Sequence, residues 1–381
     1  MARTLSFAWI GLALSLALAA DAQGKACNKC KGQGLVACRE HGREDLSHEL
    51  DVLYCSVVDG CEACGGTGWL DCGACEQPEK DAQLAARKAS VAAARERLAE
   101  LDTTMGRPLR KAESKHFVLV WEMSPMKVDK QLKSEHEMLH ILLERFERLF
   151  ADYTKLLEVP EEQFKKKSRV FVWSLPEDHR RGSSAFCDMQ VAGGAKLMGL
   201  DPNYSVCGNK SYFVGDEQLH RNLIHCVTHL LFSHQQPSNW IGALQSGWIE
   251  EGLPHWFEDR YFGVVDNYCF QEQNTRFDFR GGHFKPALRD LVEKGEMPPV
   301  AGVMQRNTDE LGPAEHAVAL ALVDYLMATD AKALGLVGSD LRGRVPVRDA
   351  LEQRFKLSIL DLEQKLGPWV IANYPAERGS R

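Results

Sequence analysis

The sequence predicts an α+β protein in which a small cysteine-rich module and a helical linker precede a larger mixed domain. Three observations predict this organisation. Residues 23–78 hold eight of the twelve cysteines, residues 79–101 are alanine-rich without glycine or proline, and from residue 113 short apolar runs alternate with longer segments of helical periodicity. At roughly 150 residues per domain, a chain of 381 residues has room for this division.

The composition excludes two broad classes of protein. With 44% hydrophobic residues the chain can fill a core, so disorder is not its dominant state. Its net charge of -7 argues against a nucleic-acid binder that works by neutralising phosphates.

The first 22 residues are predicted to be a secretory signal peptide. Arg3 precedes an uncharged stretch over residues 5–20, and Ala20-Asp21-Ala22 has the small-x-small pattern of a cleavage site. The stretch is short for a transmembrane helix, and no later segment is long and apolar enough to be one. We therefore expect a secreted or periplasmic protein without a membrane span after cleavage.

Residues 23–78 contain an internal repeat with a shift of 34 residues. A two-residue gap between cysteines lets both sulfurs face one tetrahedral ion, so the repeat predicts two structural zinc sites. A disulfide framework is the alternative in an exported protein, but the histidine in register with a cysteine favours zinc. The eight predicted ligands are Cys27, Cys30, Cys38, His41, Cys61, Cys64, Cys72 and Cys75.

The strings CNKCKGQG and CEACGGTG resemble the cysteine-rich domain of DnaJ-type chaperones. The resemblance implies nested pairing of the half-sites, and pairing within each repeat is the alternative. It also implies a capacity to bind peptides or unfolded protein segments. In the nested arrangement, one zinc is bound by Cys27, Cys30, Cys72 and Cys75, and the other by Cys38, His41, Cys61 and Cys64.

Residues 79–112 are predicted to form a helical linker, a semi-rigid spacer that ends near Gly106. The domain at 113–381 then begins with buried strands at 117–121 and 170–173, separated by a helix over 130–157. Residues 184–215 are rich in glycine and turn-forming residues, which predicts a small meander. Within it, Cys187 and Cys207 can form a disulfide, whereas Cys55 and Cys269 have no evident partner.

A charge-free segment at 222–249 carries the strongest chemical signal of the second domain. Its apolar residues form one helical stripe, and His225 and His229 lie four apart on another side of the same helix. Imidazoles at positions i and i+4 converge on one point, so a buried pair of this kind predicts a metal ion.

Downstream, the string WIEEGLPHW makes the chain resemble the gluzincin metallopeptidases, the thermolysin-like clan with a peptidase-MA-like domain. In that family, a second helix reading W-x-x-E-G-L-A supplies the third zinc ligand. The resemblance implies a gluzincin-like fold over about residues 113–376 and a third zinc ion. Its implied ligands are His225, His229 and Glu251.

Three departures from the gluzincin pattern weaken the expectation of catalysis. Cys226 occupies the position of the general-base glutamate, and Pro254 replaces the usual alanine, where it can kink the helix. The residue that stabilises the transition state has no clear match, and His316 is a candidate. Losing a general base typically costs ~100- to 10,000-fold in rate, so the sequence predicts a pseudo-peptidase that binds peptides or proteins.

Two other functions stay open at this stage. One is an active zinc hydrolase that uses another base, such as Glu250 or a bound water. The other is a structural cell-envelope protein in which all the zinc sites only stabilise the fold.

Overall fold

The computed structural model describes residues 27–32, 34–39, 61–74, 79–209, 213–234, 240–268 and 279–376. Outside these ranges lie the predicted signal peptide, two predicted zinc ligands (His41 and Cys75) and two further cysteines (Cys55 and Cys269). Within the described part of the chain, no helix is long and apolar enough to span a membrane.

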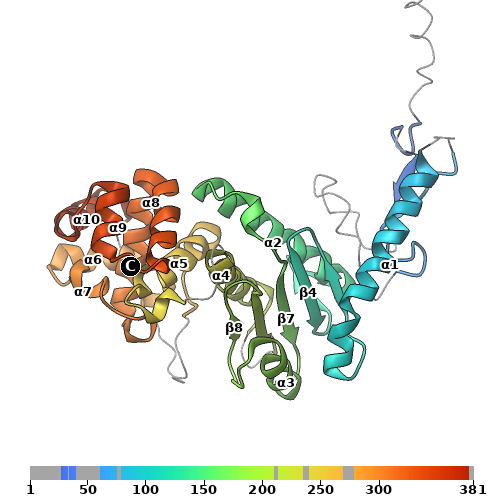
Figure 1. Ribbon diagram of the computed structural model, residues 1–381, viewed down its shortest axis with the longest axis horizontal. Helices are drawn as coiled ribbons and strands as arrows, with labels where there is room; N and C mark the ends of the chain where they lie inside the picture. The colour runs from blue at the N-terminus through green and yellow to red at the C-terminus, as the bar shows by residue number, and fades with distance from the viewer. Residues whose placement is uncertain are drawn as a thin grey trace, which may run out of the picture.

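The α+β class predicted from the sequence is confirmed by a mixed five-stranded sheet surrounded by helices (Figure 1). The central pairs β4–β7 and β7–β9 are parallel, and the outer pairs β3–β4 and β9–β8 are antiparallel. In spatial order the strands are β3 (Lys111–Glu113), β4 (Phe117–Glu122), β7 (Ser168–Trp173), β9 (Asn203–Cys207) and β8 (Ala195–Leu197).

The unbroken apolar run of β4 arises because both faces of the sheet are covered. Phe117, Leu119 and Trp121 point into the main core, whereas Val118 and Val120 point into a second core on the opposite face. Successive side chains of a strand alternate between faces, so five consecutive apolar residues are buried.

Next to the sheet, the main core is formed by two helices, α2 (Glu135–Leu157) and α4 (Asp216–His234), and it continues into the C-terminal helices. α2 begins later than predicted, because the hairpin of β5 (Met126–Val128) and β6 (Gln131–Lys133) precedes it. Ser134 then caps α2 by accepting a hydrogen bond from the backbone of Glu137, whose side chain bonds back to Ser134.

The region predicted as a small meander contains the antiparallel hairpin of β8 and β9, but its first residues belong to a helix and the hairpin is part of the main sheet. α3 (Pro176–Cys187) covers the second core, and β9 is a buried strand within the main sheet, parallel to β7. The glycine-rich sequence was misleading because its glycines lie in the connections, while all five residues of β9 are buried.

The C-terminal half is built on contacts between α4, α5 (Gly247–Phe262) and α8 (Pro313–Arg342). α5 approaches α8 closely at Gly252, where a Cβ atom would lie 2.5 Å from the carbonyl oxygen of Ala319. Figure 1 shows α4 and α5 between the sheet and the remaining helices. Besides α8, those helices are α6 (Phe284–Lys294), α7 (Val300–Val303), α9 (Val347–Phe355) and α10 (Ile359–Asn373). Short 3-10 turns of this half are η4 (Ile241–Ala243), η5 (Arg280–Gly282) and η6 (Thr308–Glu310), whereas η3 (Glu161–Gln163) lies between α2 and β7.

The predicted linker is the long helix α1 (Lys80–Met105), which ends at Gly106 in the left-handed conformation. Its last turns pack into the second core through Leu98, Leu101 and Met105. Its first turns contact the cysteine-rich module, so α1 is packed at both ends and is not a free spacer.

Candidate metal centres

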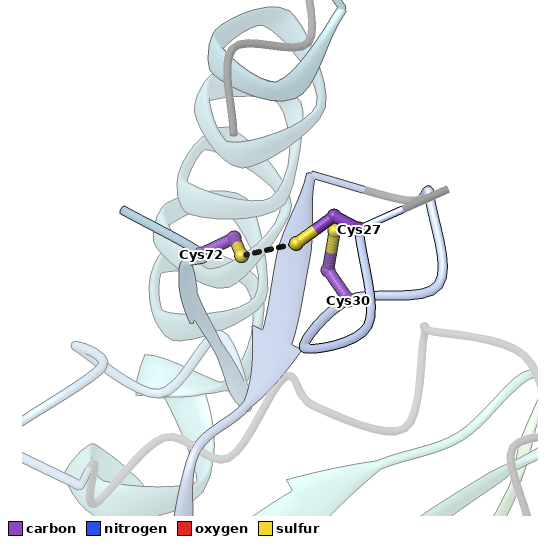
Figure 2. Close-up of side chains that lie close together, drawn as sticks. All are labelled: Cys27, Cys30 and Cys72. Carbon is purple, nitrogen blue, oxygen red and sulfur yellow. Dashed lines mark hydrogen bonds between the residues drawn. The ribbon is translucent and has the colours of Figure 1, made fainter. Parts of the chain in front are cut away.

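The cysteine-rich module is a two-stranded ribbon of β1 (Leu35–Ala37) and β2 (Trp69–Asp71) with one cysteine triad on each side. In one triad, the sulfur atoms of Cys27 and Cys72 are 3.7 Å apart, as Figure 2 shows, with Cys30 beside them. In the other, the sulfurs of Cys38 and Cys61 are 3.8 Å apart, and Cys64 completes the group. Two thiolates on one tetrahedral zinc ion are separated by ~3.8 Å, given Zn–S bonds of ~2.3 Å.

The two repeats are related by a local two-fold axis. Val36 pairs with Leu70, its equivalent at the shift of 34 residues, in the centre of the ribbon. On either side, the backbone N–H groups of Cys38 and Cys72 donate to the carbonyls of Gly68 and Gly34, at 2.9 and 3.0 Å. Each triad therefore combines cysteines from both repeats.

The backbone around the triads favours thiolates. The N–H groups of Gly34 and Gly68 each donate to a cysteine sulfur, of Cys30 and Cys64 respectively, at 3.2 Å. Both glycines have a positive φ (75° and 74°), which turns the N–H back toward the sulfur. Hydrogen bonds from backbone N–H groups also lower the pKa of the Cys27 thiol, which favours the metal-binding form.

Six of the eight predicted zinc ligands are described, and they are grouped as in the nested arrangement. Pairing within each repeat would instead bring Cys38 to Cys27 and Cys30. No described cysteine forms a disulfide, so both triads are available to a metal. The fourth ligand predicted for each site, Cys75 and His41 respectively, lies outside the described residues.

The second candidate centre lies where α4, α5 and α8 meet. His225 and His229 on α4 direct their Nε2 atoms to within 3.3 Å of each other. Glu251 on α5 faces both, with carboxylate oxygens 3.4 Å from Nε2 of His229 and 3.7 Å from Nε2 of His225. These three residues, which the sequence predicted as zinc ligands, can hold one ion together.

Two more carboxylates orient the histidines from behind. Nδ1 of His229 lies 3.0 Å from Glu250, and Nδ1 of His225 lies 3.2 Å from Glu258. For His229, the hydrogen bond from Nδ1 to the Glu250 carboxylate fixes the tautomer in which Nε2 has a free lone pair for a metal. Glu250 therefore supports a ligand, and this position argues against its predicted alternative role as general base.

His255 was not predicted as a site residue, and His316 was predicted only as a candidate to stabilise the transition state. Both belong to the cluster: Nε2 of His255 lies 2.9 Å from Nδ1 of His316, and they face Glu251 at 3.6 and 3.9 Å. His255 follows Glu251 by four residues on α5, so the i, i+4 spacing that revealed the first histidine pair could have revealed it.

The whole cluster is shielded from solvent. His225, Glu251, His255, Glu258 and His316 are 0% exposed, and His229 and Glu250 are 1% exposed. Burial lowers the pKa of His225 and His255 well below the ordinary value and that of His316 to about 4. These imidazoles are therefore neutral at pH 7 and can bind a cation through their lone pairs.

The buried charge calls for a cation. Three carboxylates of α5 (Glu250, Glu251 and Glu258) are buried, and the buried guanidinium of Arg342 lies near Glu250. Without further compensation, burial raises the pKa of Glu258 well above its ordinary value. A buried carboxylate is stable only when it is protonated, paired or bound to metal, so a cation at Glu251 would compensate the charge of this side chain.

The structure shows the surroundings of Cys226 and Pro254, two residues that depart from the gluzincin pattern. Cys226 is buried in the main hydrophobic core and belongs to none of the groups of residues that can hold a metal. Pro254 does not end α5, which continues through it from Gly247 to Phe262. Proline has a helical φ and removes one backbone hydrogen bond, which the packed helix tolerates.

The predicted disulfide between Cys187 and Cys207 is not formed. The thiols donate to different carbonyls, Cys187 to that of Ala195 and Cys207 to that of Ser174. Burial raises the pKa of Cys187 to about 12, so this thiol is an unreactive packing group.

No protein-family model and no curated protein matches this chain. The interpretation of the two centres therefore rests on their residues and geometry.

A cavity of about 540 Å³ opens near the start of α5, between η4 and the turn that joins α8 to α9. Ser246, Asn307 and Arg344 are among its lining residues, and no residue of the histidine–glutamate cluster lines it. This cavity therefore gives no access to the cluster.

Proposed function

We propose that this is an exported zinc protein whose C-terminal domain has a gluzincin-like metal centre that binds zinc without hydrolysing peptides. The observation that carries this proposal is the burial of the centre. The candidate ligands are 0–1% exposed. A catalytic zinc ion needs an open coordination position that substrate can reach, whereas a structural ion is enclosed by the protein.

The chemistry of the neighbouring side chains supports the same conclusion. Gluzincin catalysis needs a carboxylate that takes the proton of the zinc-bound water and passes it to the leaving amine. The position of this carboxylate is occupied by Cys226, whose side chain packs in the hydrophobic core. Glu250, the nearest substitute, already lies against Nδ1 of His229.

In this proposal, His225, His229 and Glu251 hold a zinc ion that stabilises the domain. The distances between their ligand atoms are 3.3–3.7 Å. Two ligand atoms of a tetrahedral ion with bonds of ~2.0–2.1 Å are expected to lie ~3.3 Å apart, so these distances are close to those of a zinc site. The ion also neutralises buried carboxylates that the core would otherwise exclude.

The cysteine-rich module adds two structural zinc ions and a binding role. Its resemblance to the cysteine-rich domain of DnaJ-type chaperones supports the binding of exposed peptide or protein segments by this module. The predicted signal peptide supports a secreted or periplasmic location, where such segments of other exported proteins are the available partners.

The decisive test measures zinc content and proteolysis on the same full-length mature protein. We expect no chelator-sensitive hydrolysis of unfolded protein substrates. We also expect His229→Ala to lose zinc from the C-terminal domain. The cysteine-bound ions should remain, which cobalt substitution can verify through thiolate-to-cobalt charge-transfer bands.

The matched control is His220→Ala, which removes a histidine of the same helix outside the cluster and should leave the zinc content unchanged. Zinc-dependent hydrolysis by the wild type, lost in Cys226→Ala, would overturn the non-catalytic assignment. An unchanged zinc content in His229→Ala would overturn the assigned zinc ligands.

A further inference from the structure

We propose that the C-terminal centre binds a second divalent cation, held by Glu251, His255 and His316, so that Glu251 bridges two ions. The proposal rests on the first ion at His225, His229 and Glu251. It assigns a ligand role to His255 and His316, which form the other half of the same buried cluster.

The separations around Glu251 are those of ligands that share an ion. Its carboxylate oxygens lie 3.6 Å from Nε2 of His255 and 3.9 Å from Nδ1 of His316. Both distances exceed those of hydrogen bonds, which rarely pass ~3.2 Å between nitrogen and oxygen. Two ligands of one ion at bonds of ~2.1 Å lie ~3–4 Å apart, depending on the angle at the metal.

A single ion cannot serve all four histidines. Among the groups that can hold a metal, one joins His225, His229 and Glu251, and another joins Glu251, His255 and His316. A third group joins His225 and His255 through Glu258. Ligand atoms within each group lie within 4.8 Å of one another, but the five together do not form such a group. The pairs His225–His229 and His255–His316 can each bind an ion of their own when Glu251 is shared between them.

The second group is as deeply buried as the first. Glu251 and His255 are one turn apart on α5, and both are 0% exposed. His316 lies in the first turn of α8, which Gly252 allows to approach α5 closely. Aromatic rings enclose the pair, with Tyr268 4.9 Å from His316 and Phe284 5.5 Å from His255 between ring centroids.

The second group is suited to a first-row transition metal. The 2.9 Å between the two imidazole nitrogens corresponds to ~90° at a metal with bonds of ~2.1 Å. Two histidines and one carboxylate with such an angle suit five- or six-coordinate Zn²⁺, Fe²⁺ or Mn²⁺. On metal binding, the imidazole that donates the hydrogen bond would lose the proton of its facing nitrogen and take one up on its other ring nitrogen, so that both facing nitrogens offer lone pairs.

Cadmium-113 NMR on the full mature chain tests this proposal, with Cd²⁺ as the probe. Resonances of nitrogen- and oxygen-bound cadmium are separate from those of the thiolate-bound ions in the cysteine-rich module. We expect two such resonances in the wild type and one in His316→Gln, with four metal ions per wild-type chain by elemental analysis and three in the variant.

His220→Ala, outside the cluster, should keep both resonances. A single nitrogen- and oxygen-bound resonance in the wild type would overturn the second site and leave the first intact. No such resonance would overturn the proposed zinc centre as well. If His316→Gln fails to fold, the wild-type count alone decides.

Discussion

The two candidate centres use metal ligands in opposite structural settings. In the cysteine-rich module, the buried side chains are mainly the cysteines themselves, with a small apolar cluster around Leu35 and Trp69. In the C-terminal domain, the histidines and glutamates are inserted into an extensive hydrophobic core that runs from the sheet to α10. A metal ion thus replaces a core in one region and occupies an existing core in the other.

This difference has an energetic consequence. A segment without its own core owes its folding free energy to the metal, and structural zinc in such segments contributes ~10–16 kcal/mol at pH 7. A large domain is stabilised by its own hydrophobic packing. Loss of its ion therefore leaves buried carboxylates uncompensated and lowers stability, but the domain keeps its fold. The module should therefore unfold without metal, whereas the domain should remain folded.

The largest predicted effect tests this contrast directly. On metal removal under reducing conditions, the amides of Cys38 and Cys72, which bridge the ribbon, should lose protection from hydrogen exchange. The first half of α1 should lose protection too, because Leu84 and Arg87 pack on Trp69. Amides of β4 and β7 should stay protected, as measured by exchange mass spectrometry.

The control for this experiment is the second half of α1, where Leu98 and Leu101 pack against the sheet. Protection should persist there in the metal-free protein. Equal loss of protection along the whole helix, or retained protection of the ribbon, would contradict the contrast between the two regions.

The arrangement of the module was largely accessible from the sequence, because its ligands recur at fixed spacing in a short segment. The spacing alone left nested pairing and pairing within each repeat open. The pairing of β1 with β2 brings Cys72 to Cys27 and Cys61 to Cys38. Pairing of this kind depends on contacts between strands, which a count of ligands does not contain.

The C-terminal centre was only partly predictable. His225, His229 and Glu251 were predicted because they fit a known spacing. His255 was missed because the gluzincin pattern expects no ligand there, and His316 lies 61 residues beyond His255. Its contact depends on how α8 packs on α5, and such packing is not encoded in local periodicity.

The second prediction concerns that packing. In Gly252→Ala, the new Cβ would lie 2.5 Å from the carbonyl oxygen of Ala319 and 2.8 Å from Val323, so α5 and α8 must separate. Overpacking of this kind costs about 1–3 kcal/mol. Urea unfolding should show this loss, and the zinc content of the C-terminal domain should fall. Gly193→Ala, where the added Cβ meets no atom within 4 Å, should change neither.

The third prediction distinguishes a buried histidine from a metal-bound one. Burial lowers the pKa of His220 on α4 to about 3, with Arg145 and Arg148 adding to the shift, and its ring packs against Phe262. The unfolded chain binds this proton below ~6.5, so folding stability falls as the pH drops from 7 toward 3. At pH 5 the loss is about 2 kcal/mol.

His220→Gln should remove that part of the acid sensitivity, measured as the difference between the free energies of unfolding at pH 7 and pH 5. The metal content at pH 7 should remain that of the wild type. The same acid loss in both proteins would mean that His220 is not the group responsible.

The smallest predicted effect separates the cysteines of the two regions. Cys38 is one of three sulfurs around a predicted zinc ion, whereas Cys226 is 4% exposed within the hydrophobic core and outside the metal-binding groups. A buried free cysteine behaves as a small apolar side chain, so Cys226→Ala should lower stability by about 1 kcal/mol. Cys38→Ala should instead lose a zinc ion and the fold of the ribbon.

If Cys226→Ala also lost metal, Cys226 would be a ligand, and the division between a thiolate module and a histidine–glutamate centre would fail. Elemental analysis of both variants at equal protein concentration decides between these outcomes.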